Sequence, residues 1–202
     1  MTPKIFFIAG CNGTGKSSFI NSTFSGNLPK IDPDLIKKEN NCSEIDAGKI
    51  AIDLTNYYLK NKITFIREST LTSNLDFKVL EISKKLGYKS ILFYIGVSDS
   101  MVLIERIRCR VAAGGHNIPT DTVIRRFYKS INNLIKAIPL FDKVLVYDNT
   151  ENKYKKIISF ENSEVQNFKF CPAWFEKVVQ QLNISSIHNI YDSPDDDYSP
   201  HP

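Results

Sequence analysis

The chain has 202 residues, of which 42% are hydrophobic, so it is long enough to bury the core of one α/β domain. Its net charge of +4 is too small to indicate a nucleic-acid-binding protein by itself. The four cysteines include no CxxC pair, which argues against a zinc site or a disulfide framework. No apolar run is long enough to span a membrane, so we expect a cytoplasmic protein with no membrane partner.

Apolar runs alternate with helical patterns along most of the chain, which predicts a mainly parallel sheet covered by helices on both faces. The expected strands are 4–9, 28–31, 64–67, 90–97, 143–147, 155–160 and 168–170. The expected helices are 16–24, 44–60, 74–86, one capped by Asp99 and ending near 113, one capped by Thr120 or Asp121 and ending near Ile138, and 172–182. We therefore predict a single α/β domain over residues 1–182, followed by an acidic, proline-rich and flexible tail over 183–202.

A complete phosphate-binding sequence lies between the first strand and the first helix. Residues 10–17, GCNGTGKS, match the pattern G-x-x-x-x-G-K-[ST]. Its glycines allow backbone N–H groups to wrap an anion, and the helix that follows directs its positive dipole end at the phosphates. Lys16 is expected to reach the β and γ phosphates, and the Ser17 hydroxyl to bind Mg²⁺. The predicted nucleotide-binding residues of this segment are Asn12, Gly13, Thr14, Gly15, Lys16, Ser17 and Ser18.

Motifs elsewhere in the chain discriminate among the classes of P-loop protein. A GTPase should carry an Asn-Lys-x-Asp motif, but Asn61-Lys62 is followed by Ile63-Thr64. An ABC-type ATPase should carry a Leu-Ser-Gly-Gly-Gln signature and an apolar strand that ends in Asp-Glu, and the sequence has neither. A kinase needs an acid near the acceptor hydroxyl and arginines for the transferred phosphoryl group. The sequence therefore favours an ATP-dependent kinase.

Acidic and hydroxyl side chains follow the second and third expected strands. Because the carboxyl ends of parallel strands face the ligand crevice of an α/β sheet, Asp34 is a candidate general base for the acceptor hydroxyl. In an alternative interpretation, Asp32 simply caps a helix that starts after Pro33. Glu68 and Thr70 could bind substrate hydroxyls or hold Mg²⁺ through water, although Thr70 could also be a helix cap.

The most basic stretch of the chain covers residues 101–136, which hold seven Lys or Arg residues and two acids. Arg106 and Arg110 are four residues apart and share one helix face, so both can point at one anion. The break at 114–119, between two helices, suits a mobile lid that closes over phosphates. A solvated basic face is the alternative. A nucleic-acid partner is not expected, because only Phe127 and Tyr128 interleave aromatic rings with these charges.

Together these segments resemble the zeta-toxin-like P-loop kinases, including a branch of predicted kinases. The matching segments are 9–18 (AGCNGTGKSS), 31–36 (IDPDLI), 65–73 (FIRESTLTS), 105–134 and 146–149 (VYDN). The resemblance covers roughly residues 4–150 and implies a three-layer P-loop NTPase/kinase fold with a helical basic lid. Characterised members of this family use ATP and Mg²⁺ to phosphorylate a sugar hydroxyl of UDP-N-acetylglucosamine.

The resemblance also implies roles for single residues on the donor and acceptor sides. Lys16 and Ser17 match the residues that serve ATP and Mg²⁺, and Asp34 matches the general base. Glu68 and Thr70 match the family's acid-x-Thr substrate contacts.

On the lid, Arg106 best matches the family's phosphate-binding arginine, and Arg110 is the second choice. The family's next phosphate-binding arginine, just before the proline of the lid, has no counterpart here. His116 is nearest and is expected either to contact the substrate or to order the loop, while Arg125 or Arg126 could supply the missing charge. After the fifth expected strand, Asp148 and Asn149 lie by the adenine or make a turn.

We therefore expect an enzyme that transfers the γ-phosphate of ATP to a hydroxyl of a sugar nucleotide or a similar small molecule. Two alternatives remain open at this point: a nucleotide or polynucleotide kinase, and a nucleotide-dependent regulatory ATPase with slow hydrolysis. If the protein is a toxin it needs a neutralising antitoxin partner, but no segment of the sequence identifies such a surface.

Overall fold

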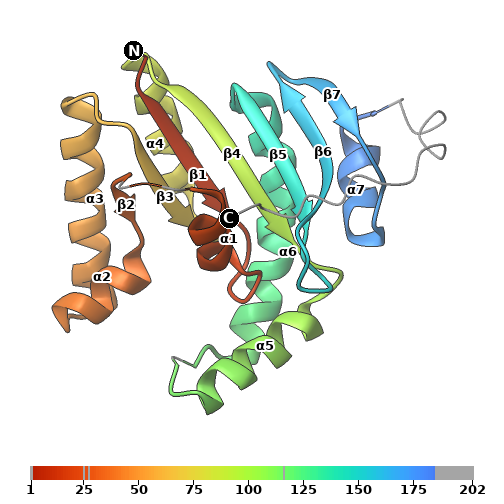
Figure 1. Cartoon of the computed structure of the whole chain (residues 1–202), viewed down its shortest axis with the longest axis horizontal. Helices are drawn as coiled ribbons and strands as arrows, with labels where there is room; N and C mark the ends of the chain where they lie inside the picture. The colour runs from red at the N-terminus through yellow and green to blue at the C-terminus, as the bar shows by residue number, and fades with distance from the viewer. Residues whose placement is uncertain (1, 25, 27, 116, 185–202) are drawn as a thin grey trace.

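The computed structural model describes residues 2–24, 26, 28–115 and 117–184. Its centre is one seven-stranded sheet with the strand order β2-β3-β1-β4-β5-β6-β7 (Figure 1). The first five strands in this order pair in parallel, and β6 and β7 are antiparallel. The strands are β1 Lys4–Ala9, β2 Lys30–Ile31, β3 Phe65–Ser69, β4 Lys89–Gly96, β5 Lys143–Asp148, β6 Lys155–Glu161 and β7 Glu164–Phe168. The mainly parallel sheet is confirmed.

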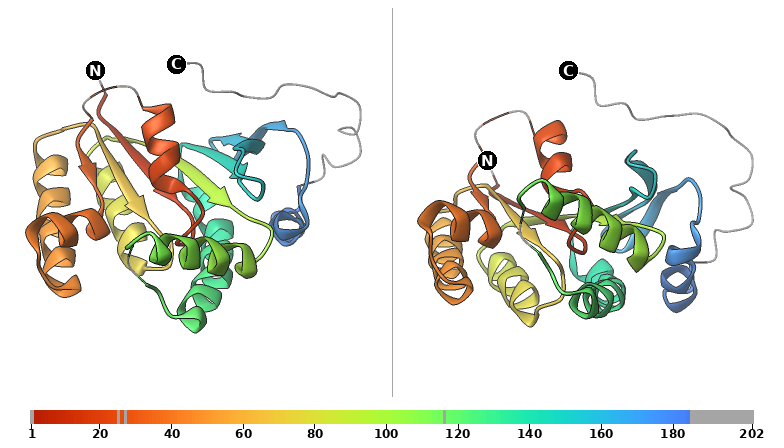
Figure 2. Two further views of the ribbon diagram at one scale, coloured as in Figure 1. Left: turned by 60° about the horizontal axis from the view of Figure 1, so that its bottom comes forward. Right: turned by 90° about the horizontal axis from the view of Figure 1, so that it is seen from below.

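Helices cover both faces of this sheet, but unequally. Figure 2 shows α1 on one face, and α3, α4, α6 and α7 on the other. Helix α5 crosses the edge at which the parallel strands end. The helices are α1 Lys16–Thr23, α2 Pro33–Asn40, α3 Glu44–Lys60, α4 Asn74–Lys85, α5 Ser100–Ala112, α6 Thr120–Ala137 and α7 Ala173–Gln181, and a short 3-10 helix spans Ile138–Leu140. The predicted three-layer α/β fold is therefore confirmed, and none of the described helices is long and apolar enough to cross a membrane.

Two predicted helix starts have a clear outcome. The Asp32 side chain accepts hydrogen bonds from the N–H groups of Asp34 and Leu35, so the alternative interpretation, in which Asp32 caps a helix, is confirmed. The predicted cap at Thr120 or Asp121 is wrong. Helix α6 already includes both residues and begins after Pro119 without a side-chain cap.

The predicted strand at 168–170 is also wrong, because the strand in this region, β7, begins earlier, at Glu164. Strand β6 reverses directly at Asn162 and Ser163, which both have left-handed φ angles, 49° and 71°. Two consecutive left-handed residues form the tight turn that suits the twist of a hairpin. The turn contains no glycine, so the local pattern indicates it only weakly, and β7 follows at Glu164–Phe168.

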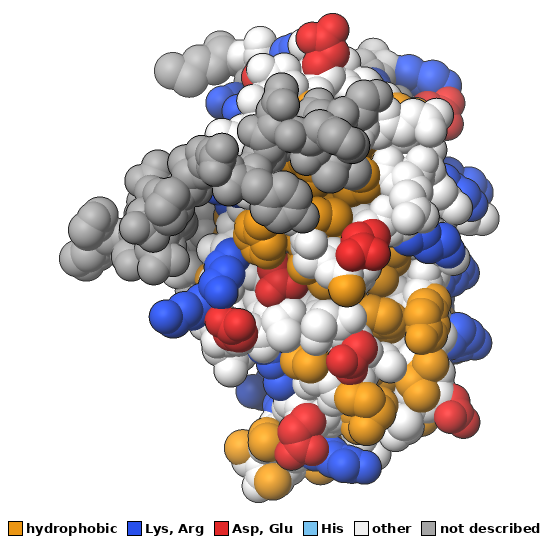
Figure 3. Space-filling view, turned by 90° about the vertical axis from the view of Figure 1, so that its right-hand side faces the viewer, with side chains coloured by type: hydrophobic (Ala, Val, Ile, Leu, Met, Phe, Trp, Pro, Cys, Tyr) orange, Lys and Arg blue, Asp and Glu red, His pale blue; other side chains and the backbone are white. Residues whose placement is uncertain are grey.

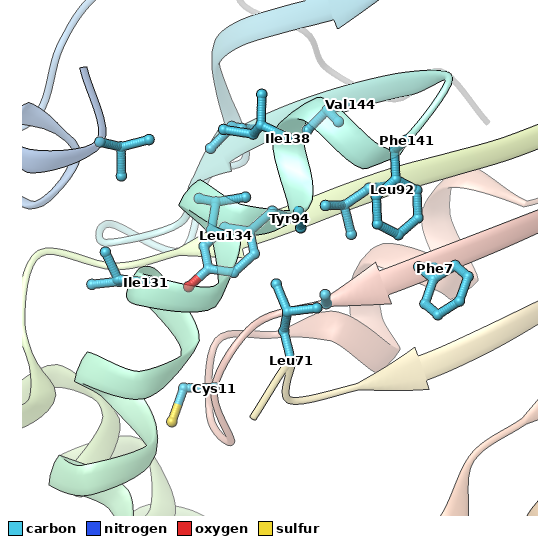
Figure 4. Close-up of a cluster of buried hydrophobic side chains, with 14 of the residues drawn as sticks. Phe7, Cys11, Leu71, Leu92, Tyr94, Ile131, Leu134, Ile138, Phe141 and Val144 are labelled. Carbon is cyan, nitrogen blue, oxygen red and sulfur yellow. The ribbon is translucent and has the colours of Figure 1, made fainter. Parts of the chain in front are cut away.

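The hydrophobic core consists of two clusters on opposite faces of the sheet. The larger cluster lies between the sheet and the helices α3, α4, α6 and α7. In Figure 4, Phe7, Leu92 and Tyr94 of the strands lie among residues of α6 and its C-terminal end, including Leu134, Ile138 and Phe141. The smaller cluster packs Phe19 and Ile20 of α1 against the other face.

Because β1 is central and its side chains enter both clusters, the loop that follows it starts from a rigid strand. The tail predicted over 183–202 lies, from residue 185 onward, outside the described residues.

Candidate active site

The glycine-rich loop between β1 and α1 adopts a backbone that requires glycine. Gly10 has a φ of 141°, and a Cβ atom there would lie 2.2 Å from the Ile95 carbonyl oxygen. Gly15 has a φ of 93°, and its Cβ atom would lie 2.7 Å from Asn149 Nδ2. Other residue types rarely adopt such φ values, and a side chain would collide with the neighbouring strands. The motif is therefore folded as a close-packed loop at the N-terminus of α1.

Side chains from other elements hydrogen-bond to three consecutive carbonyl groups of this loop. Arg106 NH1 donates to the Gly13 oxygen at 3.3 Å, Asn149 Nδ2 to the Thr14 oxygen at 2.9 Å, and Tyr154 OH to the Gly15 oxygen at 2.8 Å. Arg106 NH2 also donates to the carbonyl oxygens of Asn149 and Thr150, at 2.6 and 3.0 Å. The guanidinium predicted to bind a phosphate is thus occupied by backbone oxygens, and a phosphate contact remains a prediction.

The opposite side of the loop presents Lys16 and Ser17 to Glu68 at the end of β3. Lys16 is only 7% exposed, and its Nζ lies 3.2 Å from the Cys11 carbonyl oxygen and 3.8 Å from Glu68 Oε1. The Ser17 hydroxyl is 3.3 and 3.2 Å from the two carboxylate oxygens of Glu68. Hydroxyl and carboxylate oxygens are the ligands that Mg²⁺ prefers, so these residues suit the ion.

Protein ligands for a metal are few at this site. Among the described residues no group of three or more His, Cys, Asp or Glu side chains could hold a metal ion. Magnesium at kinase sites usually keeps several waters and is shared with substrate phosphates, which agrees with this sparse set of protein oxygens.

Lys30 is a site residue that the sequence reasoning missed. Its Nζ lies 3.1 Å from Asp32 Oδ2 and 3.3 Å from Glu68 Oε2. Burial alone would lower the pKa of Lys30, but the two carboxylates outweigh it and raise the pKa above its ordinary value, so Lys30 is charged at neutral pH. Its position two residues before Asp32 was the only sequence signal, and the contact with Glu68 depends on β2 lying beside β3.

The two acids after β2 have different surroundings. Asp32 is buried, caps α2 and pairs with Lys30. Asp34, in the first turn of α2, is exposed, and within the described ranges its carboxylate has no hydrogen bond or ion pair. Asp32 is therefore committed to the fold, whereas Asp34 is available to a ligand.

The turn after β3 is held by a buried polar network. Arg67 and Asp76 are 5% and 4% exposed and form an ion pair with an Nε to Oδ1 distance of 3.3 Å, while Ser69 Oγ donates to Asp76 Oδ2 at 2.6 Å. Thr70 follows this network, and its hydroxyl lies 2.8 Å from that of Thr72. Thr70 is not a helix cap, because α4 is capped by Ser73.

The lid residues are only partly brought to the loop. Arg126, near the start of α6, donates to Asn12 Oδ1 at 2.8 Å. Arg110 is exposed near the end of α5. His116 lies outside the described residues. The C-terminal part of α6 is core, since Ser130 and Leu134 are fully buried, so the predicted basic lid is limited to α5 and the first turns of α6.

Asp148 and Asn149 make a turn next to the loop. Asp148 is buried and accepts hydrogen bonds from the Thr150 N–H at 2.9 Å, the Thr150 hydroxyl at 3.0 Å and Trp174 Nε1 at 2.6 Å. These bonds join β5 to α7, which agrees with the turn interpretation. Asn149 Oδ1 is buried and has no hydrogen-bond partner among the described residues. Contact of either residue with adenine remains a prediction.

Burial shifts the pKa of three further groups around the loop. It raises the pKa of the Cys11 thiol, although Lys16 opposes this shift. It raises the pKa of the Tyr154 phenol, although a hydrogen bond with Ser18 and the charge of Arg106 oppose it. It lowers the pKa of Arg106, although Tyr154 and Asp148 oppose it. Cys11 and Tyr154 are therefore neutral at pH 7 and serve as hydrogen-bonding or packing groups.

A separate hollow of about 300 Å³ lies between α6, α7 and the start of α5, and none of its lining residues belongs to the predicted phosphate site. Figure 3 looks onto the side of the molecule where β7 and α7 lie, and hydrophobic side chains there are interspersed with charged ones. The lining residues are Ser98, Asp99, Phe127, Tyr128, Ile131, Asn132, Ala173, Trp174 and Lys177.

Known structures share the fold of this chain. The structure of the AvrRxo1-ORF1:-ORF2 complex with ATP matches with a TM-score of 0.62 and 15% identity over 82% of this chain. The chain spans 60% of the length of that structure. The structure of the PezAT toxin–antitoxin system of Streptococcus pneumoniae matches with a TM-score of 0.60 and 18% identity, covering 90% of this chain and 78% of that one. At these identities the likeness shows the fold.

Sequence comparison identifies the family. An uncharacterized protein of Haemophilus influenzae is 35% identical over 132 residues, which are 63% of this chain and 94% of that protein. The family model described as zeta toxin matches residues 1–157, which include the glycine-rich loop, the acids after β2 and β3, and both basic helices. With this match over most of its length, the chain belongs to the zeta toxin family.

Proposed function

We propose that this protein transfers the γ-phosphate of ATP to a hydroxyl group of a small molecule, and that a sugar nucleotide such as UDP-N-acetylglucosamine is the first acceptor to test. The observation that carries the proposal is the position of Glu68. Its carboxylate contacts Lys16 and Ser17 on the loop side and Lys30 on the β2 side, so the predicted donor and acceptor residues meet at one end of the sheet.

The donor half consists of the loop and its basic neighbours. The backbone of residues 12–18 and the Lys16 ammonium would hold the β and γ phosphates. Ser17 would bind Mg²⁺, which would neutralise the charge of the phosphates there. Arg126 lies against the loop through Asn12, and Arg110 lies on the exposed part of the lid, so both could reach the phosphates when α5 moves. The AvrRxo1 complex was determined with ATP, which supports ATP as the donor.

The acceptor half consists of the residues that follow β2 and β3. Asp34 is exposed in the first turn of α2, and we propose that its carboxylate accepts the proton of the acceptor hydroxyl as that oxygen attacks the γ-phosphorus. Glu68 and Thr70 would orient the acceptor, and the Arg67–Asp76 network would keep their turn in place. In a phosphoryl transfer the protein works mainly by positioning and by electrostatic stabilisation.

A screen of acceptors tests this proposal. The protein is incubated with ATP, Mg²⁺ and one candidate at a time: UDP-N-acetylglucosamine, other sugar nucleotides, free sugars, nucleosides or an oligonucleotide with a free 5′ hydroxyl. We expect mass spectrometry to find a phosphorylated sugar nucleotide that requires both ATP and Mg²⁺. Phosphorylation of the nucleoside or oligonucleotide alone would overturn the acceptor assignment and favour a nucleotide or polynucleotide kinase. ATP hydrolysis without any phosphorylated acceptor would favour a regulatory ATPase.

An antitoxin partner belongs to the same proposal. The PezAT structure comes from a toxin–antitoxin system, and this chain has the same family and fold as a zeta toxin. If the acceptor is an essential sugar nucleotide, its phosphorylation would harm the producing cell, and a protein that blocks the site would be needed. Co-expression with neighbouring open reading frames, read out as rescued growth, tests this partner.

A further inference from the structure

The outer side of the glycine-rich loop carries an arrangement of donors that the phosphate motif does not include. Arg106, Asn149 and Tyr154 donate to the carbonyl oxygens of Gly13, Thr14 and Gly15, at 3.3, 2.9 and 2.8 Å. We call these three side chains the carbonyl clamp. Arg106 comes from α5, and Asn149 and Tyr154 from the connection between β5 and β6, so two segments far from the loop in sequence fix three consecutive peptide groups.

The direction of these bonds determines where the N–H groups of the loop point. In a planar trans peptide the C=O of one residue and the N–H of the next point in opposite directions, and the described chain has no cis peptide bond. With the carbonyls of Thr14 and Gly15 held from outside, the N–H groups of Gly15 and Lys16 point to the inner side. There they extend the anion-binding end of α1.

The clamp packs tightly against the loop, and its central contact, from Asn149 to Thr14, is buried. A Cβ atom on Gly15 would lie 2.7 Å from Asn149 Nδ2 and 2.9 Å from the Tyr154 hydroxyl, so no space separates the loop from its clamp. Asn149 directs its Nδ2 at the loop although its buried Oδ1 has no hydrogen-bond partner within the described part of the chain.

Arg106 connects the clamp to the turn after β5. Its NH2 group donates to the carbonyl oxygens of Asn149 and Thr150, and its NH1 group donates to Gly13. A lysine ammonium has no planar fork with which to reach the same three oxygens. The arginine therefore fixes the loop through geometry, in addition to its charge.

We propose that Arg106, Asn149 and Tyr154 are positioning residues that hold the loop in its anion-binding shape, so that the loop binds the phosphate chain of a nucleotide whether or not adenine is attached. The proposal rests on the proposed function only in that the loop binds the phosphates of ATP. A loop that is ordered before binding loses less conformational entropy when the anion arrives. Loss of one clamp bond should therefore weaken every ligand that carries the same phosphates.

Binding measurements with two ligands test the clamp. Wild-type protein and Tyr154→Phe are titrated calorimetrically with Mg²⁺–ATP and with Mg²⁺–tripolyphosphate, which has the phosphate chain without base or sugar. We expect Tyr154→Phe to raise the Kd of both ligands by the same factor, roughly 3- to 10-fold, the usual effect of one hydrogen bond. If only ATP bound more weakly, Tyr154 would serve the adenine base of ATP. If the Kd values of both ligands stayed unchanged, the clamp would be overturned.

Two further variants complete the test. Tyr88→Phe is the matched control, because the Tyr88 hydroxyl also donates to backbone carbonyl oxygens, those of Tyr58 and Ile63, away from the loop; it should leave both Kd values unchanged. Arg106→Lys keeps the charge and loses the fork, so it should weaken both ligands. If Arg106→Lys kept both affinities and lowered only kcat, Arg106 would act on the reacting phosphate and not as a clamp. If wild-type protein binds neither ligand, it is the proposed function that fails.

Discussion

Lys16→Ala is expected to lower kcat for phosphoryl transfer by about 10²–10³-fold, the usual effect of removing one preorganised charged donor. The Lys16 ammonium is nearly buried and lies between the Cys11 carbonyl and Glu68, so its position is fixed at the N-terminus of α1. Low local dielectric makes its interaction with the developing charge stronger than it would be in water. Steady-state kinetics with the acceptor identified by the screen measures the effect.

The control for Lys16→Ala is Lys136→Ala, which removes an exposed lysine in the last turn of α6 and should keep full activity. Circular dichroism confirms that both variants are folded. A Lys16→Ala protein whose kcat stays within a few-fold of the wild-type value would contradict the assignment of the loop as the donor site.

Asp34→Asn is expected to lower kcat by about 10²–10⁴-fold, the range of general acid–base catalysis, while the Kd of Mg²⁺–ATP remains unchanged. Asparagine keeps the size of the side chain and cannot accept a proton at neutral pH. Because Asp34 is exposed and its carboxylate has no hydrogen bond or ion pair among the described residues, the substitution should lower the free energy of unfolding by less than about 1 kcal/mol, the usual contribution of an acid in the first turn of a helix. Kinetics, calorimetry and thermal unfolding of the same preparation separate these effects.

Asp32→Asn is the matched comparison, since it changes an identical side chain two residues earlier. Asparagine is also a good helix cap, but the ion pair with Lys30 is lost, so stability should fall and kcat should change much less than in Asp34→Asn. A larger loss of kcat in Asp32→Asn than in Asp34→Asn would make Asp32 the general base. Full activity in both variants would show that neither carboxylate is the general base.

Local features of the sequence were sufficient to predict the loop, the parallel sheet and most helix boundaries. Glycine spacing dictates the loop because only glycine tolerates its φ angles, and the periodicity of 44–60 predicts α3 with the bounds observed. The contacts that complete the site join residues far apart in sequence. Tyr154 reaches Gly15 across 139 residues, and no local pattern indicates such a contact.

The site residues that were missed depend on strand order and helix orientation. Lys30 meets Glu68 only because β2 pairs with β3 in parallel. Helical spacing indicated that Arg106 and Arg110 share a face of α5, but the spacing could not show that backbone carbonyls occupy the Arg106 guanidinium. A direct contact of Arg106 with ATP therefore stays a prediction, and the clamp offers a different role for it.

The most direct test of phosphoryl transfer is to follow the γ-phosphate of labelled ATP in a reaction that contains Mg²⁺, wild-type protein and UDP-N-acetylglucosamine. The label is partitioned between the acceptor and free inorganic phosphate. We predict that the label appears on a hydroxyl of the sugar nucleotide faster than as inorganic phosphate, and that Asp34→Asn suppresses the transfer. Label that appears only as inorganic phosphate, with every acceptor of the screen, would contradict the kinase assignment.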